Sequence, residues 1–333
     1  MKRERGAALL LAMLTVTLVA TLASAALWQQ WRHVAVEEAE RDRLQAGWIL
    51  TGALDWARLI LREDARTNQN TGSGDHLAEP WAIGLQEARL SSFLAADKNT
   101  DPPPALDAFL SGDIEDQQAR LNFANLAEGG KLSDPDLRMF ASLFDQLGLN
   151  QAELLGVARQ WVAASQALQT NAAAPAANGA GGTPLLPQRV SQLGWLGLSA
   201  TSVARLAPYV TVLPERTAVN LNTAPVEVLV AAVPQLDKAR ARRLVEQRAL
   251  QPFKNLGDAR QSLGAAGEPL TDQHHTVSSR YFVVRGRLRL GERVLQEQSL
   301  VVRNGLEVRT LWRERTAATA AALSLDGQNV SLQ

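Results

Sequence analysis

The sequence contains no cysteine and only two tyrosines and four histidines among its 333 residues. Without cysteine the chain has no disulfide, no thiolate metal site and no cysteine nucleophile. Its 34 basic and 34 acidic residues give a net charge of +0, so no whole-chain field attracts nucleic acid or acidic lipid. The sequence also lacks a G-x-S-x-G elbow, a phosphate-binding loop and a pair of metal ligands on one helix. We therefore expect no enzymatic activity.

A long apolar stretch near the N-terminus is the most prominent positive feature. Residues 7–27 contain no charge, glycine or proline, and as a helix they would span about 30 Å, the thickness of a membrane's hydrocarbon core. Lys2, Arg3 and Arg5 precede the stretch and favour a cytoplasmic N-terminus. An alternative is an ordinary secretory signal, because Ala23-Ser24-Ala25 fits a cleavage site of the A-x-A type.

The residues after the apolar stretch favour an anchor that is retained. Trp28 and Trp31 lie where an interfacial aromatic belt would fall, and helical spacing of apolar residues continues to about Arg66. No glycine or proline separates the two parts. The pattern predicts one helix of about 60 residues, with a transmembrane part (7–27) and an amphipathic part (28–66).

The C-terminal part has the pattern of an antiparallel sheet. Apolar and polar residues alternate from Tyr281 onward, and Gly291-Glu292 and Asn304-Gly305 are hairpin signals. We expect a three-stranded meander over 281–313, preceded in the chain by a strand around Ile114 and a second strand through Leu121 and Phe123. Between these parts the patterns are mainly helical, which predicts an inserted α-helical domain.

One segment of this insertion resembles a helix-hairpin-helix unit. In "VNLNTAPVEVLVAAVPQLDKARARRLVEQR" we expect Thr223 to cap a first helix and Pro234–Asp237 to form the hairpin before a second helix. Residues 237–254 hold six basic residues against two acidic ones, a net charge of +4. However, Gln235 and Asp237 stand where DNA-binding members have glycines, so their side chains hinder close approach to phosphate.

Several segments together resemble a known family. The leader "KRERG" before "AALLLAMLTVTLVATLA" is similar to a type IV pilin-like signal, in which prepilin peptidase cuts after the glycine and methylates the new N-terminal amine. Together with "DIEDQQARLNFANLA", "VNLNTAPVEVLVAAV" and "YFVVRGRLRLG", it resembles the minor pseudopilins of type II secretion, the general secretion pathway protein K family. The resemblance implies cleavage between Gly6 and Ala7, and N-methylation of Ala7.

The residue five positions after this cut departs from most pilin-like proteins. They carry a glutamate there, which pairs with the amine of the subunit above, whereas this chain has Leu11. A lone carboxylate in lipid costs about 2.5–3.5 kcal/mol, so leucine suits a subunit with nothing above it. The resemblance thus implies a non-catalytic subunit at the tip of the periplasmic pseudopilus, which nucleates or caps its assembly for export of folded proteins.

The same resemblance implies an α+β fold, with a long N-terminal helix packed on an antiparallel sheet and a large helical insertion. The expected regions are a leader (1–6), the two-part helix (7–66), a pilin-like domain (67–124 and 268–315), the insertion (125–267, with the hairpin unit at 219–263) and a disordered tail (316–333). Expected partners are other minor pseudopilins, prepilin peptidase and inner-membrane lipid, with the C-terminal domain in the periplasm.

Two further possibilities concern ligands. Proteins of this family type can bind calcium, and Asp113, Glu115 and Asp116 are candidate ligands, since calcium requires several oxygens. No other cofactor is expected. The alternative function is a membrane-anchored DNA receptor of competence type, which also joins an N-terminal anchor to a helix-hairpin-helix. Leu11, the glycine-poor hairpin and the C-terminal meander favour the pseudopilin, and no nucleic-acid partner is expected.

Overall fold

A computed structural model describes residues 4–90, 108–169, 185–291 and 293–319. The first element, α1 (Glu4–Thr71), is a continuous helix of 68 residues and confirms the predicted long N-terminal helix. The chain divides into two compact units, residues 1–53 and residues 54–333. Absence of proline throughout α1 leaves its backbone hydrogen bonds uninterrupted.

The second unit is built on a five-stranded antiparallel sheet with the order β1-β2-β9-β10-β11. The strands are β1 (Leu85–Arg89), β2 (Ala108–Asp116), β9 (Tyr281–Leu290), β10 (Arg293–Asn304) and β11 (Glu307–Thr319). The predicted meander is confirmed as β9, β10 and β11. At the second hairpin Gly305 has φ +60°, the left-handed conformation that glycine adopts without strain.

The end of β11 corrects one expectation. Residues 316–319, expected to begin a disordered tail, continue the strand, with Thr319 opposite Arg293 of β10. The rest of that expected tail, 320–333, lies outside the described residues. The apolar alternation in the sequence of β11 stops before its last residues. Those residues still form a strand because the long β10 strand supplies their pairing partners.

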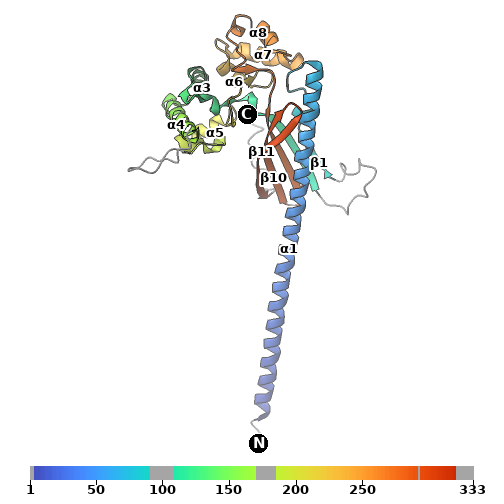
Figure 1. Cartoon of the computed structure of the whole chain (residues 1–333). Coiled ribbons are helices and arrows are strands. Elements are labelled where there is room, and N and C mark those ends of the chain that lie inside the picture. Colours follow the sequence, from blue (N-terminus) through green and yellow to red (C-terminus); the bar gives the residue numbers. More distant parts are fainter. Residues whose placement is uncertain (1–3, 91–107, 170–184, 292, 320–333) are drawn as a thin grey trace. The chain divides into compact units, whose positions relative to one another are not determined.

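The C-terminal part of α1 packs on one face of the sheet (Figure 1). Leu54, Ala57 and Leu61 of the helix share a buried cluster with Phe282 and Val301 of the sheet. A short 3-10 helix, η1 (Pro80–Ala82), adds Trp81, whose ring lies edge-on to Phe282 at 5.2 Å between centroids. The apolar stripe of the helix and the apolar face of the meander thus bury each other.

The helical insertion (residues 125–267) contains six α-helices within its described residues, and short elements lie within and around it. The α-helices are α3 (Asp134–Gln146), α4 (Gln151–Gln169), α5 (Ala200–Leu206), α6 (Val226–Ala232), α7 (Lys238–Leu250) and α8 (Leu256–Leu263). The short elements are η2 (Gln117–Ala119), β3 (Leu121–Asn122), η3 (Phe123–Leu126), β4 (Ala127–Glu128), β5 (Lys131–Leu132), η4 (Val190–Leu196), β6 (Val210–Thr211), β7 (Val219–Asn220), η5 (Gly264–Gly267) and β8 (His275–Thr276).

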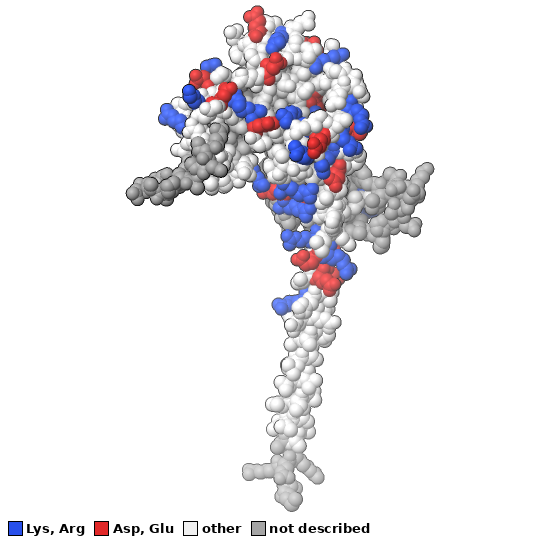
Figure 2. Space-filling view, viewed as in Figure 1, with Lys and Arg blue, Asp and Glu red and all other residues white. Residues whose placement is uncertain are grey.

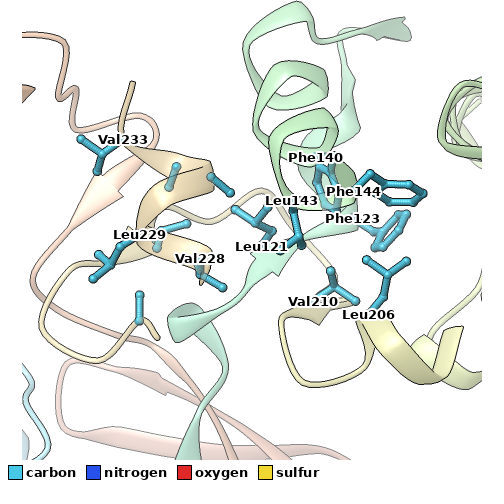
Figure 3. Close-up of a cluster of buried hydrophobic side chains, with 14 of the residues drawn as sticks. Leu121, Phe123, Phe140, Leu143, Phe144, Leu206, Val210, Val228, Leu229 and Val233 are labelled. Carbon is cyan, nitrogen blue, oxygen red and sulfur yellow. The ribbon is translucent and has the colours of Figure 1, made fainter. Parts of the chain in front are cut away.

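The insertion has its own apolar core, separate from the cluster between α1 and the sheet. Figure 3 shows Phe123, Phe140 and Phe144 grouped beside Leu206 in this core. The rings of Phe123 and Phe140 lie 4.7 Å apart between centroids. This core runs from Leu121 to Val277 in the chain, so it begins four residues before the predicted limit of 125 and ends ten residues after the predicted limit of 267.

Two predicted local features differ in detail. The strand expected around Ile114 is the nine-residue β2, which joins the main sheet. The strand expected through Leu121 and Phe123 is only the two-residue β3, which pairs in parallel with β6, and Phe123 begins a 3-10 helix. The ring of Phe123 is fully buried in the core of the insertion, and that packing takes precedence over strand propensity.

Candidate functional site: the anchor and the junction of the insertion

The N-terminal part of α1 presents apolar side chains on all sides. Leu11 is 67% exposed, and Trp28 and Trp31 are also exposed. The helix is long and apolar enough to cross a membrane, and Figure 2 shows no charged side chain on the drawn face of its N-terminal part. Gly6 and Ala7 lie within the backbone of α1, and cleavage between them and methylation of Ala7 remain predictions.

The predicted calcium ligands do not meet at one point. Asp113 accepts a hydrogen bond of 2.8 Å from Arg285 Nη1, and Glu115 pairs with both Arg285 and Arg120. Asp116 lies on the opposite face of β2, because successive side chains of a strand alternate between faces. The expected trio is thus wrong as a single ligand set, while calcium binding itself remains a prediction.

Asp116 instead forms the centre of a buried junction between the sheet and the insertion. Its side chain accepts hydrogen bonds from the hydroxyls of Thr223 and Ser279, both at 2.6 Å, and from Asn220 Nδ2 at 3.1 Å. The backbone N–H of Gln118 donates to its second oxygen at 2.7 Å. Burial raises the pKa of Asp116 to about 6, although these hydrogen bonds lower it. One carboxylate therefore joins the end of β2 to segments more than 100 residues away.

A second group of charges extends this junction to α1. Arg303 of β10 donates to Asp64 of α1 at 2.8 Å and pairs with Asp75, which follows α1 in the chain. Asp75 also accepts a 2.6 Å hydrogen bond from the backbone N–H of Ser279. Burial, and then the nearby Glu79 carboxylate, raise the pKa of Asp64 to about 7, against the opposing effect of Arg303. The network thus connects helix, sheet and insertion.

Three carboxylates of this network, Asp64, Asp75 and Glu79, have oxygens within 4.8 Å of one another. Such a group has the chemistry of a cation site. In this structure the guanidinium of Arg303 supplies the positive charge for Asp64 and Asp75. Glu79 accepts a 2.7 Å hydrogen bond from Trp81 Nε1. The cluster is therefore explained by contacts within the chain.

The asparagines of "VNLNTAP" fix the path of the chain through the junction. Asn220 Nδ2 donates to the carbonyl of Asp75 at 3.2 Å in addition to Asp116. Asn222 exchanges two 2.9 Å hydrogen bonds with the backbone of Phe253, which follows α7. Arg248 of α7, itself buried, donates to the carbonyl of Leu221. This motif therefore ties the start of the hairpin unit to α7 and to the segment after it, and joins the unit to Asp75 and Asp116 outside the insertion.

The hairpin unit contains the two predicted helices, α6 and α7. The N-cap residue of α6 differs from the predicted one. Pro225 is the N-cap residue of α6, so the expectation that Thr223 caps this helix is wrong. The hydroxyl of Thr223 binds Asp116 instead. In the hairpin, Gln235 has φ +63°, a conformation in which glycine is unstrained, and Asp237 caps α7 through a 2.8 Å bond from the N–H of Arg240.

The sequence analysis grouped Asp116 with Asp113 and Glu115 and did not identify Asp64, Asp75, Ser279 and Arg303 as members of the buried junction. A signal was present, because Asp116 follows Ile114 on the apolar face of β2, where an acidic side chain requires buried partners. The residues that satisfy it come from distant segments of the chain. Their meeting depends on the tertiary fold, which periodicity does not specify.

The comparisons with known proteins agree with this architecture. Sequence profiles of the family described as "Type II secretion system (T2SS), protein K" match residues 119–215 and 219–278. The type II secretion system protein K of Pseudomonas aeruginosa is 28% identical over 308 residues, which cover 88% of this chain and 87% of the relative. The protein of the same description from Klebsiella pneumoniae is 29% identical over 329 residues, covering 91% and 94%.

The fold is similar to that of a solved structure. A chain in the crystal structure of the GspK-GspI-GspJ complex from the type 2 secretion system of enterotoxigenic Escherichia coli matches with a TM-score of 0.61 and 19% identity. The match covers 84% of this chain and 99% of the other. At this identity the likeness concerns the fold alone.

Proposed function

We propose that this chain, which is similar to the type II secretion system protein K of other bacteria over most of its length, is the minor pseudopilin at the tip of the pseudopilus. In that position it nucleates or caps filament assembly for the export of folded proteins from the periplasm. The helical insertion is the observation that carries this proposal. A second subunit stacked directly above would have to share space with it.

The junction supports the proposal by holding the insertion on the sheet. The connections to the sheet converge on Asp116, Asp75 and Arg303, all of which are buried. Buried, hydrogen-bonded charges of this kind favour one arrangement, because any other leaves donors or carboxylates without partners. An insertion fixed in this way is a steric block, whereas a loosely tethered one could swing aside for another subunit.

Leu11 gives independent support from the opposite end of α1. A pilin-like subunit within the shaft uses a carboxylate at this position to pair with the N-terminal amine of the subunit above. A subunit with nothing above it gains nothing from that carboxylate and would carry the cost of placing it in lipid. Leucine, exposed on an apolar helix surface, has no such cost.

The proposed place of this chain at the filament tip also indicates which proteins it would contact. The solved Escherichia coli complex contains GspI and GspJ together with GspK. We extend this to the present chain, which would pack with the corresponding minor pseudopilins, whose fifth-position glutamates neutralise the amine of Ala7. Prepilin peptidase would act on the Gly6–Ala7 bond, and α1 would anchor the subunit in the inner membrane with its N-terminus cytoplasmic.

A label on this protein, viewed in intact filaments, tests the tip placement, and Leu11→Glu provides a second test. The new carboxylate has no amine to pair with at the tip, so the variant should secrete as well as the wild type or slightly worse. A clear gain in secretion, or incorporation along the shaft, would contradict the proposal. Leu10→Glu is the matched control for the cost of a carboxylate at this depth.

A further inference from the structure

The outward side of α7 differs from the rest of the insertion in its charge. The helix buries Ala241, Leu244 and Arg248, and its opposite side presents Lys238, Arg242 and Arg243 to solvent. Residues three and four apart lie on the same side of a helix, so Lys238 and Arg242 are neighbours one turn apart. Arg243 adjoins Arg242. We call these three residues the basic face of α7.

The charge of this face is only partly offset within the described part of the chain, by the exposed Glu246, which lies on the same side of α7 three residues after Arg243 and four after Arg242. Arg240 has a partner, because it lies 3.6 Å from Asp237. Among the described residues, no carboxylate forms an ion pair with Lys238, Arg242 or Arg243. By contrast, two arginines of the sheet have acidic partners: Arg285 pairs with Asp113 and Glu115, and Arg289 pairs with Glu87.

An exposed apolar side chain follows on the same side of the helix. Leu250 is 90% exposed and lies seven residues, or about two turns, after Arg243. A large apolar side chain beside unpaired cations is a combination found at protein interfaces, where an apolar contact is surrounded by charge pairs. A single exposed leucine would mean little without the adjoining charges.

The hairpin before α7 argues against phosphate as the partner of this face. Its Gln235 carries a side chain where close approach of a nucleic-acid backbone requires glycine. Asp237, 60% exposed in its side chain, adds negative charge at the start of α7 and uses the N–H of Arg240. Carboxylates on a protein surface can reach the basic face from the side without entering the hairpin.

We propose that the basic face of α7, with Leu250, docks an acidic surface of another protein. Charge complementarity defines the partner: clustered aspartate or glutamate side chains around an apolar residue. The docking accelerates association and sets orientation, and it weakens as salt screens the charges. It does not depend on the position of the subunit in the filament, so it stands or falls separately from the tip assignment.

The test uses the full-length protein in detergent and fluorescent poly-L-glutamate as the acidic probe. Arg242→Glu/Arg243→Glu reverses the charge of the basic face. Its matched control, Arg138→Glu/Arg159→Glu, reverses two exposed arginines on α3 and α4 of the same insertion. Both variants change the net charge equally, so a non-specific effect of charge lowers binding to the same degree in each.

We expect the Arg242/Arg243 variant to lose about tenfold in affinity at low salt, and the control variant less than about twofold. The Arg242/Arg243 variant should also bind poly-L-lysine more tightly than the wild-type protein does. An unfolded variant would not show this specific gain in affinity. Equal losses in the two variants would overturn the proposal. So would tighter binding of duplex DNA than of poly-L-glutamate by the wild-type protein, which would identify a nucleic-acid surface instead.

Discussion

The hydroxyl of Thr223, at the start of the hairpin unit, donates a 2.6 Å hydrogen bond to the carboxylate of Asp116 at the end of β2. This contact spans 107 residues of sequence and joins the insertion to the sheet. Asn220 and Ser279 donate to the same oxygen of Asp116. The arrangement makes one buried acidic side chain a central contact between the insertion and the sheet.

Asp116→Ala should destabilise the protein by roughly 2–4 kcal/mol, because it leaves two hydroxyls and an amide buried without their acceptor. Asp113→Ala, on the same strand three residues earlier, is the control. Its ion pair with Arg285 is partly exposed, so its loss should cost about 1 kcal/mol or less. Urea unfolding of the full chain in detergent, followed by tryptophan fluorescence, measures both. Equal midpoints for the two variants would contradict the role given to Asp116.

The titration of Asp116 predicts a dependence of stability on pH. Its pKa in the folded protein is raised from 3.8 to about 6. The folded state therefore binds this proton more tightly than the unfolded state. The stabilisation is fully present below pH 3.8 and is lost as the pH rises through about 6. Over this window the contribution amounts to up to about 3 kcal/mol.

Comparison of the wild type with Asp116→Asn isolates this contribution, since all other titrating groups are common to both proteins. The difference in free energy of unfolding, wild type minus variant, should fall as the pH rises from about 4 to 6.5. A difference that rises over this range would mean that the hydrogen bonds lower the pKa of Asp116 more than burial raises it. A flat difference would mean that Asp116 keeps its ordinary pKa.

Elements with strong local patterns could be predicted from the sequence. The apolar run and helical spacing predicted α1, and the alternation from Tyr281 with its glycine turns predicted β9, β10 and β11. In each of these the periodicity extends over enough residues to outweigh local exceptions.

The junction could not be predicted because its members are scattered. Thr223 has the residue type and setting of an N-cap, and only the approach of β2 gives its hydroxyl a stronger acceptor. Asp113, Glu115 and Asp116 form an acidic run in the sequence, but strand alternation separates Asp116 from the other two. In the sequence, Arg303 resembles the other arginines that alternate with apolar residues along a strand. In the structure it is buried and pairs with Asp64 and Asp75.

Processing at the N-terminus is predicted by the leader. Prepilin peptidase should remove six residues, so that the mature chain begins at Ala7, and Gly6→Leu should leave the precursor uncut. Mass spectrometry of protein extracted from membranes measures the N-terminus and its methylation. A mature chain that begins at Ala26 would show instead that the apolar stretch is an ordinary secretory signal.

The hairpin geometry predicts that the protein binds duplex DNA no better than background at physiological salt. The side chains of Gln235 and Asp237 keep a phosphate backbone from the hairpin, and Asp237 repels it. Fluorescence anisotropy with a labelled duplex over a range of salt concentrations measures this. Sub-micromolar binding with a steep salt dependence, lost in Arg242→Ala/Arg243→Ala, would favour the DNA receptor of competence type.

The number and position of this subunit in the filament test the central claim most directly. The protein, labelled on its periplasmic domain with gold and imaged by electron microscopy in intact wild-type pseudopili, should occur about once per filament, at the end away from the membrane. Deletion of residues 125–267 removes the steric block and should permit labels along the shaft. Labels spaced periodically along wild-type filaments would contradict the tip assignment.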